Sequence, residues 1–305
     1  MPEKMNITDI TINDWSKLHS LTRINNEIVS YIDTEDGDNT ILFLHDFGTN
    51  SYSFYKQLQE LQHEYRIVIP DLIGFGFSNK PRNYYFSILD QAQMIIKLLE
   101  KLEINSVTVV SQGYGTSVLL EIIAEIQNLN SKIINLNFTN IVLLNGSLTI
   151  EVLKSRSSND LINNTMNTKF NQIGYSYQLF EKNFNLALQQ PSKVTTNDIR
   201  ILWSLMSVNS GQRYLQFVDY TILERKQFAK KWIGALKNTR TNVLIVWGES
   251  DITNNKKLAD KLHQIVEGSE LKLIESCGHF PSLEQPEILN GILEEITKEQ
   301  ILINM

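Results

Sequence analysis

The sequence has few of the features that mark secreted, membrane-spanning or nucleic-acid-binding proteins. One cysteine, Cys277, in 305 residues excludes an internal disulfide framework and is typical of a reducing compartment. No apolar run approaches the ~18 residues that span a membrane, and the N-terminal segment is too polar for a signal peptide. We therefore expect a soluble, cytoplasmic protein without a transmembrane segment.

The chain also lacks an excess of positive charge and the common phosphate-binding motifs. The net charge is −6 and the isoelectric point is near 5.5, which argues against nucleic acid as the partner. The chain contains neither G-x-G-x-x-G nor G-x-x-x-x-G-K-[ST], so a nucleotide site is not expected. We predict no cofactor and no metal.

Short apolar runs alternate with amphipathic segments such as 88–102, a rhythm typical of a mostly parallel sheet with helices on both faces. We expect an α/β fold with an eight-stranded sheet. The runs that are expected to form strands are Ile28–Asp33, Ile41–His45, Arg66–Pro70, Ser106–Ser111, Asn140–Asn145, Asn242–Gly248 and Leu271–Ser276.

The rhythm breaks between Leu148 and Thr241, where a polar, Ser/Asn-rich stretch is followed by helical patterns without strands. A helical insertion after the sixth strand would lie over the carboxyl ends of the sheet, where open α/β sheets bind ligands. We interpret it as an α-helical cap. The predicted organisation is core in 1–149, cap in 150–240 and core again in 241–305.

The segment Val107–Ala124, "VTVVSQGYGTSVLLEIIA", has the pattern of a strand-to-helix turn around a nucleophile. With Ser111 as the small residue before the apex and Gly115 as the closing glycine, the nucleophile position falls on Gly113, which has no side chain. Ser111 lies on the strand end and not at the apex. A nucleophile in such a turn has positive φ, a strain of roughly 1–3 kcal/mol that glycine avoids.

An acid and a histidine follow in the order of an α/β-hydrolase triad. Asp251 follows the predicted strand Asn242–Gly248, and His279 follows the last strand in "LIESCGHFP". A carboxylate on one ring nitrogen would fix the tautomer of the imidazole and leave the other nitrogen to take a proton. We predict that Asp251 and His279 are hydrogen-bonded.

Backbone N–H groups complete the predicted catalytic site. The residue after the apex, Tyr114, and Phe47 in the loop "LFLHDFGTNSYSFY" are the expected oxyanion donors. Asp71, in "PDLIGFGFSNKP", is expected to support its loop and not to act in catalysis. Cap aromatics at helical spacing are more often core, but Trp203, Tyr214, Phe217, Tyr220 and Trp232 could instead line an apolar pocket, with Asp46 of the oxyanion loop at its edge.

Several segments between Trp15 and Ile296 resemble the mesoderm-specific transcript family, an α/β-hydrolase branch near epoxide hydrolases and haloalkane dehalogenases. The strongest is "IPDLIGFGFSNKPRNYYFSILDQAQMI"; "HDFGTNSYSFYK" and the cap segments "ILWSLMSVNSG" and "QRYLQFVDYTILERKQFAKKWIGAL" are also similar. The resemblance implies an α/β-hydrolase fold and an aspartate nucleophile that attacks an electrophilic carbon, after which histidine-activated water releases the ester.

The chain departs from this family twice, and both departures fall at the site. Gly113 stands where the family carries Asp, and Asp46 stands where the family carries Gly in the oxyanion loop. If Asp46 points inward, its charge would oppose the negative charge that the oxyanion hole stabilises. An enzyme variant altered only at its nucleophile would not also differ at Asp46, which lies outside the nucleophile position. The two departures together therefore favour a naturally altered site.

Three functions remain open from the sequence. We favour a catalytically impaired hydrolase, or pseudo-hydrolase, that binds a small apolar molecule or a protein partner. The alternative is an active hydrolase of esters, epoxides or alkyl halides in which the Asp251–His279 pair activates water directly. A pure scaffold is the third, and it predicts a filled site.

Overall fold

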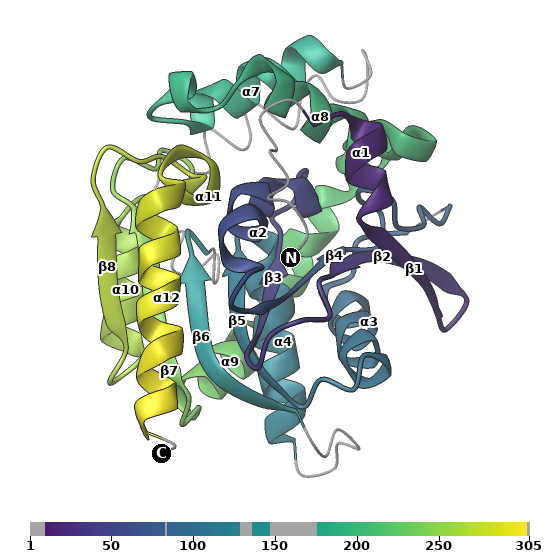
Figure 1. The fold of residues 1–305 in the computed structure, drawn as a ribbon. Coiled ribbons are helices and arrows are strands. Elements are labelled where there is room, and N and C mark those ends of the chain that lie inside the picture. The colour runs from purple at the N-terminus through teal and green to yellow at the C-terminus, as the bar shows by residue number, and fades with distance from the viewer. Residues whose placement is uncertain (1–9, 83, 129–135, 147–175, 304–305) are drawn as a thin grey trace.

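The structure is a computed structural model, and it describes residues 10–82, 84–128, 136–146 and 176–303 (Figure 1). Its centre is an eight-stranded sheet with the order β1-β2-β4-β3-β5-β6-β7-β8. The strands are β1 (His19–Ile24), β2 (Glu27–Asp33), β3 (Thr40–Leu44), β4 (Arg66–Asp71), β5 (Ser106–Gln112), β6 (Asn137–Leu144), β7 (Asn242–Gly248) and β8 (Glu270–Ile274). The predicted eight-stranded sheet is confirmed.

The sheet is parallel from β4 through β8, whereas β1 and β2 run antiparallel at one edge. Strands β3, β5 and β6 are apolar and almost completely buried, as expected for parallel strands covered on both faces. The sequence prediction missed β1. Its residues "HSLTRI" are largely polar and mostly exposed or half-buried, so they lack the apolar run that identified the central strands.

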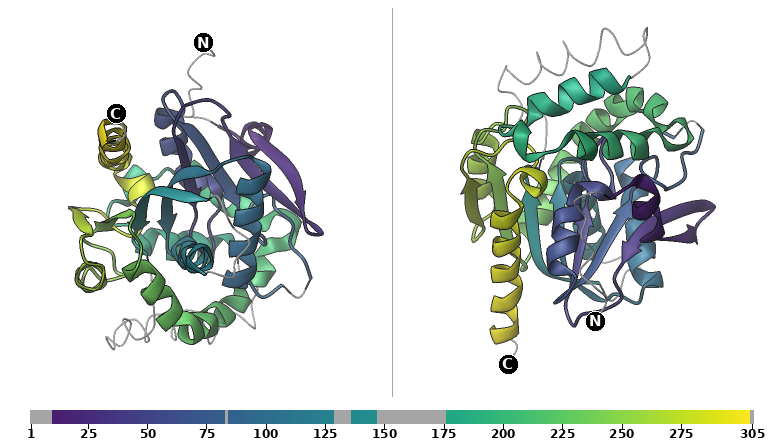
Figure 2. Two further views of the ribbon diagram at one scale, coloured as in Figure 1. Left: turned by 90° about the horizontal axis from the view of Figure 1, so that it is seen from below. Right: turned by 45° about the horizontal axis from the view of Figure 1, so that its top comes forward.

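Helices cover both faces of the sheet (Figure 2). On one face α4 (Tyr114–Gln127) packs against both α3 (Ile88–Lys101) and α9 (Val218–Lys237). On the other face α2 (Tyr55–Leu61) packs against the long C-terminal helix α12 (Pro286–Ile303). The remaining core helices are the N-terminal α1 (Ile12–Lys17), α10 (Lys257–Ile265) and the short α11 (Pro281–Glu284).

The cap that was predicted after the sixth strand is confirmed. The described part of the chain between β6 and β7 has no strand; it contains α7 (Tyr177–Ala187), η3 (Pro191–Lys193), α8 (Thr196–Ser207) and η4 (Val208–Phe217) before α9. Helices α7 and α8 cross above the carboxyl end of the sheet (Figure 1). The polar stretch 154–172 lies outside the described residues.

Hydrogen bonds fix the cap to the core. The Asn50 side chain donates to the carbonyl of Leu202 (3.1 Å), and the Tyr52 hydroxyl donates to Asp198 (2.9 Å). Asn50 and Tyr52 belong to the loop that follows β3, which also carries Asp46 and Phe47. This loop therefore connects the cap to the site described next.

Candidate active site

Gly113 forms the turn between β5 and α4. Its φ is +50° and its ψ is −109°, a left-handed conformation that glycine adopts without strain. The prediction of a positive φ between strand and helix is confirmed, and the helix begins one residue earlier than expected, at Tyr114. Gly115 is required for close packing, because a Cβ there would lie 2.4 Å from the carbonyl oxygen of Leu44.

The carboxylate of Asp46 points inward, toward the backbone N–H of Tyr114 and the ring of His279. Its Oδ1 atom accepts hydrogen bonds from two backbone N–H groups, those of Phe47 (2.7 Å) and Tyr114 (2.5 Å). These are the two donors predicted for the oxyanion hole. One carboxylate oxygen therefore accepts both of the hydrogen bonds that were predicted for an oxyanion.

Asp46 also fills the space that a side chain at position 113 would need. A Cβ built on Gly113 would lie 1.8 Å from Oδ1 and 2.0 Å from the carboxyl carbon of Asp46. Atoms that are not bonded cannot approach so closely, so the two positions share one volume. The carboxylate at this point of the site comes from the loop after β3 instead of from the turn after β5.

His279 and Asp251 are hydrogen-bonded, as predicted. The distance from Nδ1 of His279 to Oδ2 of Asp251 is 2.7 Å, inside the expected range of ~2.7–3.2 Å. The other oxygen of Asp251 accepts from the backbone N–H groups of Thr253 (2.7 Å) and Asn254 (2.9 Å). The carboxylate is thus held in one orientation at the end of β7.

The second ring nitrogen of His279 faces Asp46. Its Nε2 lies 2.9 Å from Oδ2 of Asp46. Both ring nitrogens therefore face carboxylates, and both contacts are hydrogen bonds only when both nitrogens carry protons. The geometry selects the imidazolium form of His279, with an aspartate on each side.

The electrostatics agree with this geometry. Burial alone would lower the pKa of His279, but the charges and hydrogen bonds of Asp251 and Asp46 raise it to about 10. Burial alone would raise the pKa of Asp46; the hydrogen bond and charge of His279 and the N–H groups of Tyr114 and Phe47 outweigh it and lower that pKa. At neutral pH the site holds a carboxylate–imidazolium–carboxylate row.

Several supporting residues were not predicted from the sequence. Asn145 donates to Oδ2 of Asp251 (2.7 Å) and accepts from the N–H of Gly248 (3.0 Å), and it has a φ of +45°. Gln112 donates to the carbonyl oxygen of His279 (2.7 Å). Both residues lie at the carboxyl ends of strands, and that position is the signal that could have identified them.

Glu284 connects the histidine loop to the cap. Its Oε1 accepts from the N–H groups of Gly278 (3.0 Å) and Phe280 (3.3 Å), and its Oε2 accepts from those of Gln189 (2.7 Å) and Gln190 (2.9 Å). The N–H of His279 itself donates to the carbonyl of Ala187 at the end of α7 (2.9 Å). The cap therefore helps to hold the loop that carries His279.

Two polar residues near the turn have structural contacts. The Ser111 hydroxyl lies 3.2 Å from that of Thr116 and faces the backbone of β6, so it is not directed at His279. The carboxylate of Asp71 accepts from the backbone N–H groups of Ser51 and Phe77, both at 2.8 Å. Asp71 thus holds two loops, in agreement with its predicted supporting role.

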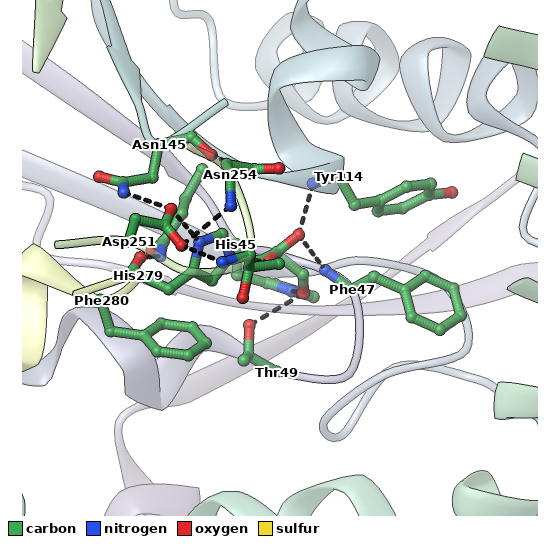
Figure 3. A network of polar contacts seen from close by, with 12 residues as sticks. His45, Phe47, Thr49, Tyr114, Asn145, Asp251, Asn254, His279 and Phe280 are labelled. Atoms are coloured by element: carbon green, nitrogen blue, oxygen red, sulfur yellow. Dashed lines mark hydrogen bonds and ion pairs between the residues drawn. The ribbon is translucent and has the colours of Figure 1, made fainter. Parts of the chain in front are cut away.

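Aromatic rings flank the row on both sides (Figure 3). On one side the ring of Phe47 has edge-to-face contacts with Phe75, Phe86 and Tyr114, at centroid distances of 5.2–5.6 Å. On the other side Phe280 packs edge-on against His279 and stacks on Phe184 of α7 (4.7 Å). Aromatic rings therefore border the row, although the charge of Asp46 also acts on the guanidinium of Arg225 in α9.

The cap aromatics that the sequence analysis assigned to the core or to a pocket contact different elements. Trp203 packs against Tyr177 and Phe180 within the cap. Trp232 is fully buried, and its indole N–H donates to Glu121 of α4 (2.6 Å). Tyr220 is exposed and contacts Tyr85. The side chains of Tyr214 and Phe217 lie outside the described residues.

Within ranges 10–82, 84–128, 136–146 and 176–303, no group of three or more His, Cys, Asp or Glu side chains has an arrangement that could hold a metal ion. Over the same part of the chain, no helix has both the length and the apolar character needed to cross a membrane.

Comparison with known proteins identifies the family of the chain. Residues 39–286 match the model of the alpha/beta hydrolase fold family. LipZ of Mycobacterium tuberculosis, described as a candidate hydrolase, is 24% identical over 81% of this chain and 84% of its own. The mouse mesoderm-specific transcript protein is 24% identical over 81% of this chain and 75% of its own.

Solved structures are similar in fold. A variant of the meta-cleavage product hydrolase of Pseudomonas fluorescens IP01 superposes with a TM-score of 0.74 at 19% identity, covering 93% of this chain and 98% of its own. At this identity the likeness shows the fold alone. Together with the family match over residues 39–286, it establishes that the chain belongs to the α/β-hydrolase fold family.

Proposed function

We propose that this protein binds a small apolar molecule at the Asp46–His279 site and is impaired in the hydrolysis of esters. One observation carries the proposal: Oδ1 of Asp46 accepts hydrogen bonds from both Phe47 N–H and Tyr114 N–H. Ester hydrolysis on this fold uses these donors for the oxyanion of the substrate. Here they hold a carboxylate of the protein itself.

Three further conditions for ester hydrolysis are missing. Gly113 provides no attacking atom, and Nε2 of His279 is engaged by Asp46 at 2.9 Å. The negative charge of Asp46 would also repel a developing oxyanion. These contacts argue equally against direct activation of water by the Asp251–His279 pair, because an imidazolium has no free lone pair with which to accept a proton.

The apolar ligand is inferred from the rings around the carboxylate. Phe47 adjoins Asp46 through its N–H, and the ring of Phe280 packs edge-on against His279; apolar walls with few polar groups are typical of small-molecule sites. The side chain of Asp46 is 16% exposed, so it keeps some contact with solvent. The finer family relationship, to the mesoderm-specific transcript branch, is part of this proposal and rests on the segments quoted above.

The proposal is tested by measuring binding and ester hydrolysis separately. Calorimetry with ethylbenzene should give a heat of binding, and p-nitrophenyl butyrate should be hydrolysed no faster than in solution without the protein. Gly113→Ser combined with Asp46→Gly should hydrolyse the ester on the order of 10²–10³-fold faster than Gly113→Ser alone, because the two donors become free. Rapid hydrolysis by the wild-type protein, or no binding of ethylbenzene, would refute the proposal.

A further inference from the structure

In the described part of the chain, β8 has a neighbouring strand on one side only. It is the last strand of the sheet and pairs with β7, so its other side forms an edge (Figure 1). The carbonyl of Ile274 accepts a hydrogen bond from the N–H of Glu249, directly after β7 (2.9 Å). Backbone polar groups alternate in direction along a strand, so those of Leu271 and Leu273 point outward. An edge of this kind is a template for pairing with another strand.

We propose that two copies of this protein form a dimer in which β8 of one copy pairs antiparallel with β8 of the other. A two-fold axis places the same surface on both sides of the interface. The sequence of β8, "ELKLI", must therefore be complementary to itself when it is read in the opposite direction. This surface is separate from the Asp46–His279 site, so the dimer does not depend on the proposed ligand.

One register of this pairing brings opposite charges together. When Leu271 lies opposite Leu271 of the other copy, Glu270 lies opposite Lys272 of the other copy on both sides of the axis. A register centred on Lys272 would place two lysines opposite each other, and one centred on Glu270 would place two glutamates opposite each other. The favoured register also lets the outward N–H and C=O groups of the two Leu271 residues bond to each other.

The charged side chains of β8 suit this register. A free lysine on an edge strand repels a second strand, but Lys272 is held by its own chain. Its Nζ lies 2.6 Å from Oε2 of Glu295 in α12 and 3.5 Å from Oε1 of Glu270. The side chain of Glu270 is 65% exposed, so it can reach Lys272 of the other copy. Pairing would join two glutamates and two lysines in a square of alternating charge.

The other face of the strand provides an apolar contact. Side chains alternate between the two faces of a strand, so Leu271 and Leu273 project away from the face that carries Lys272. Leu271 is half-buried against the core, and Leu273 is 39% exposed. In the favoured register the two Leu271 side chains meet at the axis. Both faces of β8 are therefore complementary to themselves, one through charge and the other through apolar surface.

Pairing at β8 covers neither candidate active site. Asp251 follows β7 and His279 follows β8, so the site lies at the carboxyl end of the parallel strands. Antiparallel pairing of the two β8 strands directs these ends in opposite directions. The two sites would then lie on opposite edges of one continuous sheet, to which each copy contributes eight strands.

Sedimentation equilibrium of the full chain tests for the dimer. The wild type should approach twice its monomer mass of 35.1 kDa at high concentration and return to the monomer on dilution, because a five-residue strand forms a small interface. Glu270→Lys and Lys272→Glu each place like charges opposite each other at two points. Each substitution should raise the dissociation constant of the dimer by at least about tenfold. A wild type that stays monomeric at every concentration, or a dimer that neither substitution weakens, would overturn the inference.

A mixture of the two charge variants tests the register. Glu270→Lys presents two lysines at the edge and Lys272→Glu presents two glutamates, so a mixed dimer places opposite charges at both points. We expect the mixture to form a dimer at a concentration at which each variant alone is monomeric. Loss of folding cannot produce this recovery, and circular dichroism of each variant establishes that it is folded. A mixture that stays monomeric would refute the pairing.

The matched control reverses a charge at the opposite edge of the sheet. Arg23 is exposed on β1, the strand at that edge, and Arg23→Glu should form the dimer with the dissociation constant of the wild type. If Arg23→Glu dissociates the dimer as strongly as Glu270→Lys does, the effect is not specific to β8 and the inference is wrong.

Discussion

At the scale of single residues, Gly113 and Asp46 act as a pair because their side-chain positions occupy one volume. A Cβ at Gly113 would lie 1.8 Å from the Asp46 carboxylate, and the left-handed turn at φ +50° favours glycine for a second reason. An aspartate at 46 therefore requires a residue without a side chain at 113. This coupling explains why both departures from the resembled family occur in one chain.

We predict that Gly113→Asp alone destabilises the protein. The new side chain adds roughly 1–3 kcal/mol of backbone strain at positive φ and collides with Asp46. Adding Asp46→Gly should recover the part of the loss that comes from the collision, measured by urea unfolding. The collision also predicts that the single variant forms little covalent adduct with an electrophile. Equal stability of the single and double variants would contradict the shared-volume account.

Residue identities at the site were partly predictable. The Asp251–His279 hydrogen bond followed from the order of strands and motifs, because strand ends at one edge of a parallel sheet converge. The inward direction of Asp46 did not follow, since a loop residue can point either way and the sequence contains no rotamer information. The same holds for Asn145 and Glu284, whose roles depend on backbone groups distant in sequence.

At the scale of elements, the loop with His279 depends on the cap as well as on β8. Glu284 of α11 accepts four backbone hydrogen bonds, two from the histidine loop and two from residues that follow α7. Element types were predictable where periodicity is strong, as in α3 and β5. The edge strand β1 and the connections between elements were not, because polar edges and single carboxylates leave no periodic pattern.

We predict that Glu284→Ala is strongly destabilising. Each buried donor left unpaired costs roughly 1–3 kcal/mol, and the four N–H groups that lose their acceptor belong to Gly278, Phe280, Gln189 and Gln190. The free energy of unfolding should fall by more than about 2 kcal/mol in urea titration. Glu287→Ala, at an exposed glutamate in the first turn of α12, is the matched control and should change it by less than about 1 kcal/mol. A similar effect of both substitutions would show that Glu284 is not the connection described.

At the scale of the whole molecule, the fold brings three distant parts of the chain to one point. Asp46 follows β3, Asp251 follows β7 and His279 follows β8, and the cap crosses above them (Figure 1). Neither the length of the chain nor its composition predicts that these three residues meet. The alternation of strands and helices predicts it, because this pattern forms a parallel sheet whose strand ends lie at one edge. The sheet does not determine the protonation state of His279. That protonation state depends on the buried charges of Asp251 and Asp46.

The central claim is that Asp46 holds His279 as an imidazolium, and the titration of His279 tests it most directly. In ¹⁵N NMR of the ring nitrogens, with the signal assigned by its loss in His279→Gln, we expect His279 to stay protonated until the pH rises to about 10. Asp46→Asn removes one of the two neighbouring charges and should shift this pKa downward. A wild-type pKa near 6.5, the ordinary value for histidine, would contradict the account.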